Sequence, residues 1–195
     1  KDAIIFADET AVIVGSTNST DGDVTGYHQN NNYTTDGWVV KIDTDGNIIW
    51  QKAVGGSDKD VLAFVKPGPD GDIPAVTGEN KLWIIKLDSS GNTMWSKVYD
   101  SLQIPSDAVL LSDGSLAVIA NAVVKINPQG DLIWKKLPAV SFGNYLAEYN
   151  ANAIISSGGY SFNSNTGAFY LLNWNFPAKA YKAMKAKNGT LYFAY

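Results

Sequence analysis

The sequence WVVKIDTDGNIIWQK at residues 38–52 recurs in altered form as WIIKLDSSGNTMWSK at 83–97 and AVVKINPQGDLIWKK at 122–136. In each stretch an apolar run leads into a polar turn, and the turn glycine lies four residues before a tryptophan. Glycine supplies the positive φ that tight hairpin turns require. Each stretch is therefore predicted to be a β-hairpin.

The tryptophan near the end of these hairpins stands at positions 50, 95 and 134. A β-rich unit that repeats every 40–50 residues or so is typical of propeller blades. The fold class is therefore predicted to be all-β, a β-propeller of four-stranded antiparallel blades with about four and a half blade motifs. The ring is either five-bladed or part of a larger or shared ring, and the sequence leaves these alternatives open.

The predicted organisation is a single propeller domain over residues 1–195. Its repeats cover approximately 1–55, 56–100, 101–140 and 141–180, with a partial repeat at 181–195. Each full repeat is interpreted as four strands, A to D in chain order. In the second repeat these are Val61–Val65, Ile73–Thr77, Leu82–Leu87 and Thr93–Val98.

The fourth repeat departs from this pattern. Its strands A, B and C are predicted at Tyr145–Tyr149, Ala153–Ser157 and Ala168–Leu172, which makes 159–167 a loop between B and C and leaves little room for strand D. A last A–B hairpin is predicted at Lys182–Lys185 and Thr190–Ala194.

The composition is globular and excludes several classes of partner. Apolar residues make up 45% of the chain, and no stretch has the 18 or so consecutive apolar residues of a membrane span. Cysteine is absent, so disulfides and thiolate chemistry are excluded. All 15 basic residues are lysine and the net charge is −4, which disfavours nucleic-acid binding. We expect neither nucleic-acid partners nor membrane insertion.

The repeated Trp50, Trp95 and Trp134 admit two interpretations. They pack between blades, or they form an aromatic surface on which sugar rings stack. Their equivalent position in successive repeats favours packing.

Residues 15–60 carry a denser pattern: GSTNS at 15–19, DGDVTG at 21–26, His28, DGWVVK at 36–41 and WQKAVGGS at 50–57. This segment resembles the secreted bacterial and archaeal β-propeller repeats sometimes called SBBP-like. The later repeats keep only the hairpin of strands C and D. The resemblance implies a propeller in a secreted or cell-surface protein, whose leader is not present in this chain. The family has no common activity to carry over.

Asp21, Asp23 and Asp36 are the candidate metal ligands, because carboxylates in a flexible loop supply the hard oxygens that calcium prefers. The alternative is a solvated loop. DTDGN at 43–47 is similar to the start of a calcium loop, but its counterparts lose the alternating oxygens and keep the glycine, which favours a plain turn. No other cofactor is predicted.

His28 is the single histidine, and no nucleophile motif accompanies it, so the protein is not expected to be an enzyme. The alternative from another class is a polysaccharide hydrolase or lyase that uses carboxylates of Asp58, Asp60 or Asp107. A purely structural spacer of a surface protein is the third possibility.

In blades of this topology the B–C and D–A loops open on one face, and the A–B and C–D turns open on the other. Long loops on a rigid scaffold are the usual place for recognition. The leading hypothesis is therefore a non-catalytic, extracytoplasmic module that binds a protein or glycan through the B–C/D–A face. The candidate binding residues lie in the predicted B–C loops of repeats one and four: Tyr27, His28, Tyr33, Tyr160, Phe162 and Asn163.

Overall fold

The computed structural model describes residues 1–28, 34–57, 59–78, 81–137, 142–172, 182–185 and 191–194. The fold is all-β, with four four-stranded antiparallel sheets of the kind that form propeller blades. The chain divides into two compact units, Lys1–Ile104 and Pro105–Tyr195. None of the described residues form a helix that could cross a membrane.

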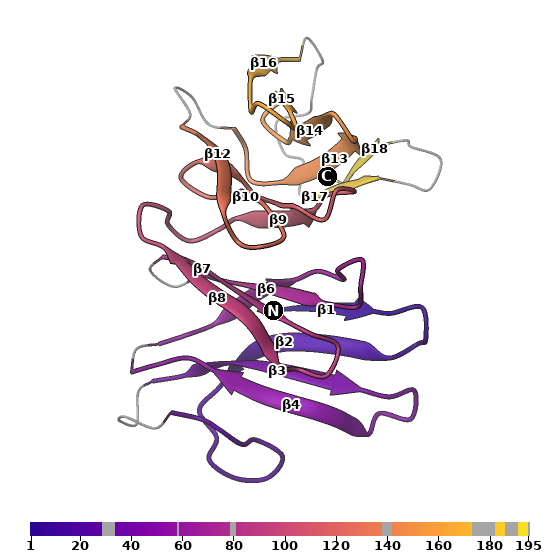
Figure 1. Ribbon diagram of the computed structural model, residues 1–195, viewed down its shortest axis with the longest axis vertical. Coiled ribbons are helices and arrows are strands. Elements are labelled where there is room, and N and C mark those ends of the chain that lie inside the picture. Colours follow the sequence, from indigo (N-terminus) through magenta and orange to yellow (C-terminus); the bar gives the residue numbers. More distant parts are fainter. Residues whose placement is uncertain are drawn as a thin grey trace. The chain divides into compact units, whose positions relative to one another are not determined.

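The first unit contains two blades, each with its strands in sequence order across the sheet (Figure 1). Strand β5 contacts β1, β2 and β3, which brings the two sheets together. Blade 1 consists of β1 (Asp2–Ile5), β2 (Ala11–Thr17), β3 (Asp36–Ile42) and β4 (Ile48–Val54). Blade 2 consists of β5 (Leu62–Val65), β6 (Ile73–Gly78), β7 (Leu82–Leu87) and β8 (Thr93–Tyr99).

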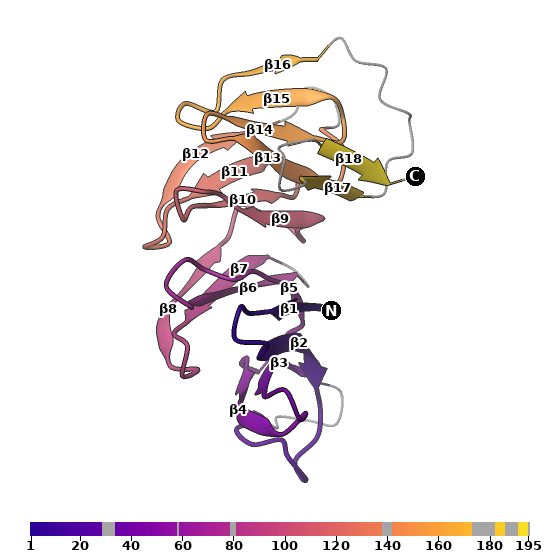
Figure 2. The same cartoon turned by 90° about the vertical axis from the view of Figure 1, so that its right-hand side faces the viewer.

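The second unit contains two further blades and a two-stranded sheet (Figure 2). Strand β13 contacts β9 on one side and β17 on the other. Blade 3 consists of β9 (Asp107–Leu110), β10 (Leu116–Ile119), β11 (Val123–Ile126) and β12 (Leu132–Lys136). Blade 4 consists of β13 (Leu146–Asn150), β14 (Ala153–Ser156), β15 (Tyr160–Asn163) and β16 (Phe169–Leu171), and the last hairpin of β17 (Lys182–Lys185) and β18 (Leu191–Ala194).

The strands of the first three repeats, the first two strands of blade 4 and the final hairpin confirm the sequence-based prediction, whereas the prediction for the second half of blade 4 was wrong. Residues 160–163 form its third strand, β15, and residues predicted as strand C form its fourth, β16. The connection between β14 and β15 is the short turn 157–159, in which Gly159 has φ +81°. The Asn, Ser and Gly content of 159–167 suggested a loop, but the aromatic side chains there pack in the core.

Within each unit, neighbouring blades pack against each other through apolar side chains. In the first unit the core combines Val12, Val39 and Val54 of blade 1 with Leu62 and Ile85 of blade 2. Strands β10 and β11 of blade 3 are buried at every position, which explains why their apolar residues do not alternate with polar ones.

The three glycine turns occupy equivalent places between the third and fourth strands of blades 1 to 3. Gly46, Gly91 and Gly130 have φ of +84°, +83° and +82°. In the first turn the Asp43 carboxylate accepts hydrogen bonds from the backbone N–H of Asp45 and Asn47 at 2.9 and 2.8 Å.

The aspartates that begin the turns of blades 1 and 2, Asp43 and Asp88, accept hydrogen bonds from residues of their own turns. The side-chain amide of Asn47 and then the backbone donors lower the pKa of Asp43, and Asn92 does the same for Asp88. In the third turn Asn127 takes the place of the aspartate and accepts from Asp131 N–H at 2.7 Å. The structure therefore supports the turn interpretation of DTDGN over a calcium loop.

Two of the repeated tryptophans pack on the glycine turn of the next blade and donate a hydrogen bond to it; we call this contact the tryptophan clasp. The Nε1–H of Trp50 donates to the carbonyl oxygen of Ser89 at 3.0 Å, and a Cβ on Gly91 would lie 2.8 Å from its ring. The Nε1–H of Trp134 donates to Ser164 O at 3.0 Å, and a Cβ on Gly167 would lie 2.7 Å from its ring. Packing between blades is thus confirmed for Trp50 and Trp134.

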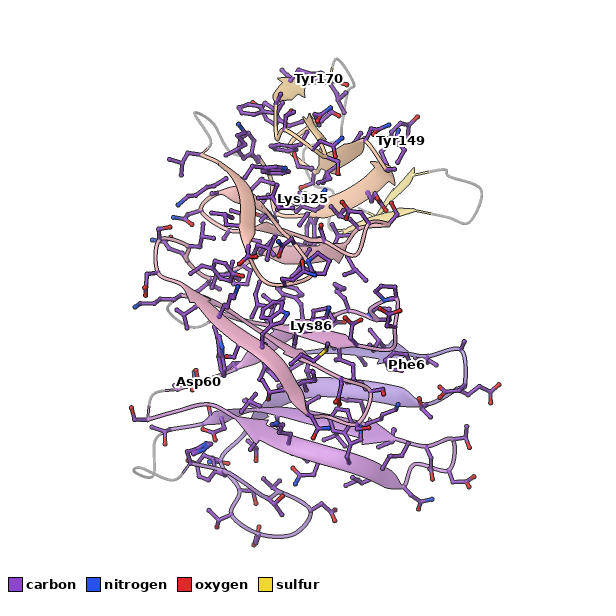
Figure 3. All side chains as sticks on the ribbon, viewed as in Figure 1. Phe6, Asp60, Lys86, Lys125, Tyr149 and Tyr170 are labelled. Carbon is purple, nitrogen blue, oxygen red and sulfur yellow. The ribbon has the colours of Figure 1, made fainter. Side chains whose placement is uncertain are left out.

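The lysine in the third strand of blades 2 and 3 is buried and paired with an aspartate of the A–B turn. Lys86 pairs with Asp72, and Lys125 pairs with Asp113 at 2.6 Å (Figure 3 labels both lysines). Burial raises the pKa of Asp113, but the hydrogen bonds from Lys125 and then Ser115 outweigh it and hold that pKa below its usual value. These pairs tie the turn to the sheet.

Candidate functional site

The first blade carries a long connection between its second and third strands. Strand β2 ends at Thr17 and β3 begins at Asp36, whereas the corresponding connections of blades 3 and 4 cover only 120–122 and 157–159. Both B–C and D–A connections leave the same end of a blade. The long loop of blade 1 (residues 18–35) therefore lies at the end predicted to carry function.

The described part of the long loop is held to blade 1 by specific hydrogen bonds. The hydroxyl of Tyr27 donates to the carbonyl oxygen of Thr34 at 2.7 Å. The amide of Gln51 on β4 donates to Thr25, and its carbonyl accepts from Trp38 Nε1–H at 2.8 Å. Tyr27 therefore acts as an anchor whose polar end faces the loop itself.

His28 is hydrogen-bonded to a buried carboxylate at the start of β3. Oδ2 of Asp36 lies 2.8 Å from Nδ1 of His28 and accepts the backbone N–H of His28 at 2.9 Å. The Asp36 side chain is 0% exposed, whereas the side chain of His28 is 59% exposed. When the carboxylate is ionised, it holds the imidazole proton on Nδ1 and leaves Nε2 as the free acceptor.

The second oxygen of Asp36 sits beside another carboxylate. Oδ1 of Asp36 is buried and has no hydrogen-bond partner among the described residues. A Cβ on Gly55, which follows β4, would lie 2.6 Å from this oxygen and 2.8 Å from Oδ2 of Asp60. Asp60 is in the connection between β4 and β5 (Figure 3), where its N–H donates to Thr35 O at 2.6 Å. Two connections of blade 1 thus meet at Gly55.

The predicted binding residues do not form one loop patch. Tyr33 lies outside the described residues. Tyr160, Phe162 and Asn163 lie on strand β15, so their assignment to a loop was wrong. Phe162 is 0% exposed and stacks with Trp134 at a centroid distance of 6.2 Å, and Asn163 Oδ1 accepts backbone N–H groups of its own turn. Of the predicted set, Tyr27 and His28 remain at the long loop.

The structure does not bring the predicted calcium ligands together. Asp21 and Asp23 are exposed, and Asp21 Oδ1 accepts the hydroxyl proton of Ser19 at 2.7 Å. Within the described ranges no three His, Asp or Glu side chains gather in a way that could hold a metal ion. Asp36 is instead committed to His28 through one oxygen.

The carboxylates considered for catalysis have separate surroundings. Asp107 Oδ2 accepts the backbone N–H of Leu146 at 2.9 Å, which is a structural contact within the second unit. Asp58 lies outside the described residues. The approach of Asp60 to Asp36 was not predicted. The pair Gly55–Gly56 after β4 was the feature of the sequence that could have indicated this approach, because glycine lets side chains come close to the backbone.

Antiparallel four-stranded sheets joined in this way define a β-propeller fold, and solved structures agree. A catalytically inactive virginiamycin B lyase from Staphylococcus aureus with quinupristin has a TM-score of 0.60 at 17% identity, over 98% of this chain and 75% of that one. A Bacteroides caccae protein of unknown function scores 0.58 at 16% identity, over 82% and 65%. BamB from Moraxella catarrhalis scores 0.51 at 19% identity, over 70% and 42%.

These likenesses show the fold alone, because all three identities are low. The chain spans 65% of the length of the Bacteroides caccae protein and 42% of that of BamB. No family model matches the chain, and no curated protein matches it. The resemblance to the SBBP-like repeats therefore stays a prediction beyond the propeller fold itself.

Proposed function

We propose that this chain is a non-catalytic binding module on a propeller scaffold, and that its ligand, a protein or a glycan, binds at the long-loop end of blade 1. We propose further that it acts outside the cytoplasm, secreted or at the cell surface, as the resemblance of residues 15–60 to secreted propeller repeats implies. The observation that carries the proposal is the long loop itself, an extended and anchored connection where blades 3 and 4 have short turns.

The surface of the loop suits polar recognition. Thr20, Asp21, Asp23 and His28 are exposed, while Tyr27 and Thr34 hold the loop from within. Anchoring matters because a preordered loop loses less conformational entropy when a ligand binds. The opposite end of the blade offers the turn 43–47, whose side-chain oxygens bond to its own backbone.

A glycan array probed with the purified protein tests the glycan branch. The triple variant Thr20→Ala, Asp21→Ala, Asp23→Ala should weaken binding at least about tenfold, because about 1.4 kcal/mol of contact energy is a factor of ten. Its melting temperature should stay within about 2 °C of the wild type, since surface substitutions usually change stability little. Asp45→Ala, an exposed change on the opposite turn, is the matched control and should bind normally.

A photo-crosslinking residue at position 23, with position 45 as control, tests the protein branch. Specific capture at 23 and not at 45 is the expected result. Binding that survives the triple variant, or capture that is equal at both positions, would place the functional surface elsewhere.

The hydrolase or lyase alternative requires two accessible carboxyls at one bond. The pair that approaches in blade 1 includes Asp36, whose side chain is fully buried, and this favours the non-catalytic proposal. Cleavage of a polysaccharide that is lost in Asp60→Asn would establish the alternative instead.

A further inference from the structure

We propose that Asp36 and Asp60, on either side of Gly55, form a site for one hard divalent cation, with calcium as the best-suited ion. One carboxylate belongs to the first residue of β3 and the other to the connection between β4 and β5, and the two meet where β4 ends. The site differs from the one that the sequence predicted, because Asp21 and Asp23 take no part in it. It is also independent of the proposed binding function.

The first argument is the unpartnered oxygen of Asp36. The side chain is 0% exposed, and Oδ2 accepts two hydrogen bonds from His28, yet Oδ1 is buried without a partner among the described residues. A carboxylate oxygen withdrawn from water carries a large desolvation cost unless it is paired. An ionised carboxylate only accepts, so the missing partner must be a donor or a cation.

The second argument is the space at Gly55. The position of a Cβ there is 2.6 Å from Oδ1 of Asp36 and 2.8 Å from Oδ2 of Asp60, so these oxygens are no farther apart than the sum of those distances. Both side chains therefore present an oxygen atom to the same small volume beside the Gly55 backbone. Glycine leaves open the space that any other residue would fill, and calcium binds oxygens at about 2.3–2.6 Å.

The third argument is the support behind the two carboxylates. His28 holds Asp36 through Oδ2, and the backbone N–H of Gly56 donates to Asp60 Oδ2 at 2.9 Å. Hydrogen bonds of this kind fix the orientation of ligating carboxylates and strengthen metal binding. His28 is thus a positioning residue for the cation site.

The ligand set predicts modest affinity. No third acidic or histidine side chain joins the pair within the described ranges, so carbonyl oxygens and water complete the coordination shell. Calcium accepts such mixed shells of six to eight oxygens more readily than magnesium accepts a distorted octahedron. With few charged ligands, we expect a dissociation constant of about 0.1–1 mM for calcium, in the range of extracellular modules.

Calorimetric titration of chelator-treated protein with calcium chloride tests the proposal, with magnesium chloride titrated separately at the same ionic strength. The expected result is one calcium site per chain and weaker magnesium binding. At ten times the dissociation constant, calcium should raise the melting temperature by about 3–6 °C, whereas sodium chloride of equal ionic strength should not.

Four variants separate this site from nonspecific binding. Asp36→Asn should weaken calcium binding at least about tenfold, and Gly55→Ala should do the same by filling the space. His28→Gln should weaken it by about tenfold or more, because it removes the supporting bond from the side chain. Asp21→Asn with Asp23→Asn, two exposed carboxylates on the same loop, is the matched control and should bind as the wild type does.

Two results would overturn the proposal. The first is a wild-type protein with neither binding heat nor a melting shift in calcium up to about ten times the upper expected constant, which would mean that water alone solvates the buried oxygen. The second is calcium binding that is unchanged in folded Asp36→Asn, or that is lost in the Asp21, Asp23 control. The wild-type titration decides the matter even if Asp36→Asn fails to fold.

Discussion

Replacing Trp134 by alanine tests whether the clasp between a tryptophan and the next blade's turn holds the fold together. Trp134 is 8% exposed, stacks on Phe162 with an interplanar angle of 7° and donates to Ser164 O. Truncation of a buried aromatic residue to alanine costs about 3–5 kcal/mol. The orphaned carbonyl of Ser164 adds about 1 kcal/mol. We therefore expect a loss of about 4–6 kcal/mol in the free energy of unfolding.

Trp134→Phe divides this loss into its parts. It keeps an aromatic ring against Phe162 but removes the indole donor, so it should cost only about 1–2 kcal/mol. Ile133→Ala is the matched surface control, because Ile133 is the exposed neighbour on the same strand and should change stability by about 0.5 kcal/mol or less.

Urea unfolding followed by far-UV circular dichroism is the appropriate assay, since removing a tryptophan alters the fluorescence signal itself. The midpoint should fall with an unchanged slope, and the melting temperature should drop by about 10–20 °C. A loss below about 1 kcal/mol for Trp134→Ala, or equal losses for alanine and phenylalanine, would refute the reasoning.

Two further predictions concern turns and buried lysines. Gly46→Ala should lower the free energy of unfolding by about 1–2 kcal/mol through the positive φ alone, because nothing lies within 4 Å of its Cβ position. Gly91→Ala should cost about 1–3 kcal/mol more, because its Cβ would contact Trp50. Equal losses for the two variants in denaturant unfolding would contradict this reasoning. Asp113→Ala should cost about 3–5 kcal/mol by leaving the buried charge of Lys125 without its carboxylate, and Lys125→Met should cost less because the Asp113 side chain is 49% exposed. Since the pKa of Asp113 is lowered, its stabilisation is present above about pH 4 and lost as pH falls through the folded-state value, so Asp113→Asn should flatten the acid decline of the melting temperature.

The first three blades could be predicted because their signals are local. A turn such as 43–47 satisfies its own hydrogen bonds, and its glycine adopts the positive φ that the sequence indicates. The fourth blade could not be predicted in this way. Its third strand is defined by Phe162 packing on Trp134 of another blade, and this contact has no local signature. The polar residues around Phe162 suggested a loop, but tertiary packing outweighed them.

The candidate site was predicted in part for the same reason. Asp36 was identified as a potential ligand from its own segment, but the carboxylate that meets it beside Gly55 is Asp60, which follows an intervening hairpin. Their approach depends on the return of β4 beside β3, and on Gly55 at the end of that strand. His28 could be singled out from the sequence, whereas its hydrogen bonds to the buried Asp36 carboxylate could be seen only in the folded blade.

The two ends of blade 1 differ in how freely they can change. At the C–D end, the turn oxygens bond to their own backbone, and in blade 2 the equivalent turn also receives Trp50. A substitution at Gly91 in the blade 2 turn therefore disturbs both a hairpin and a contact between blades. At the opposite end the connections vary in length from 120–122 in blade 3 to 18–35 in blade 1. The length and sequence of the loops at this end can therefore vary without disturbing the tryptophan–turn contacts. For this reason we expect both the binding surface and the cation site beside His28 and not at the repeated turns.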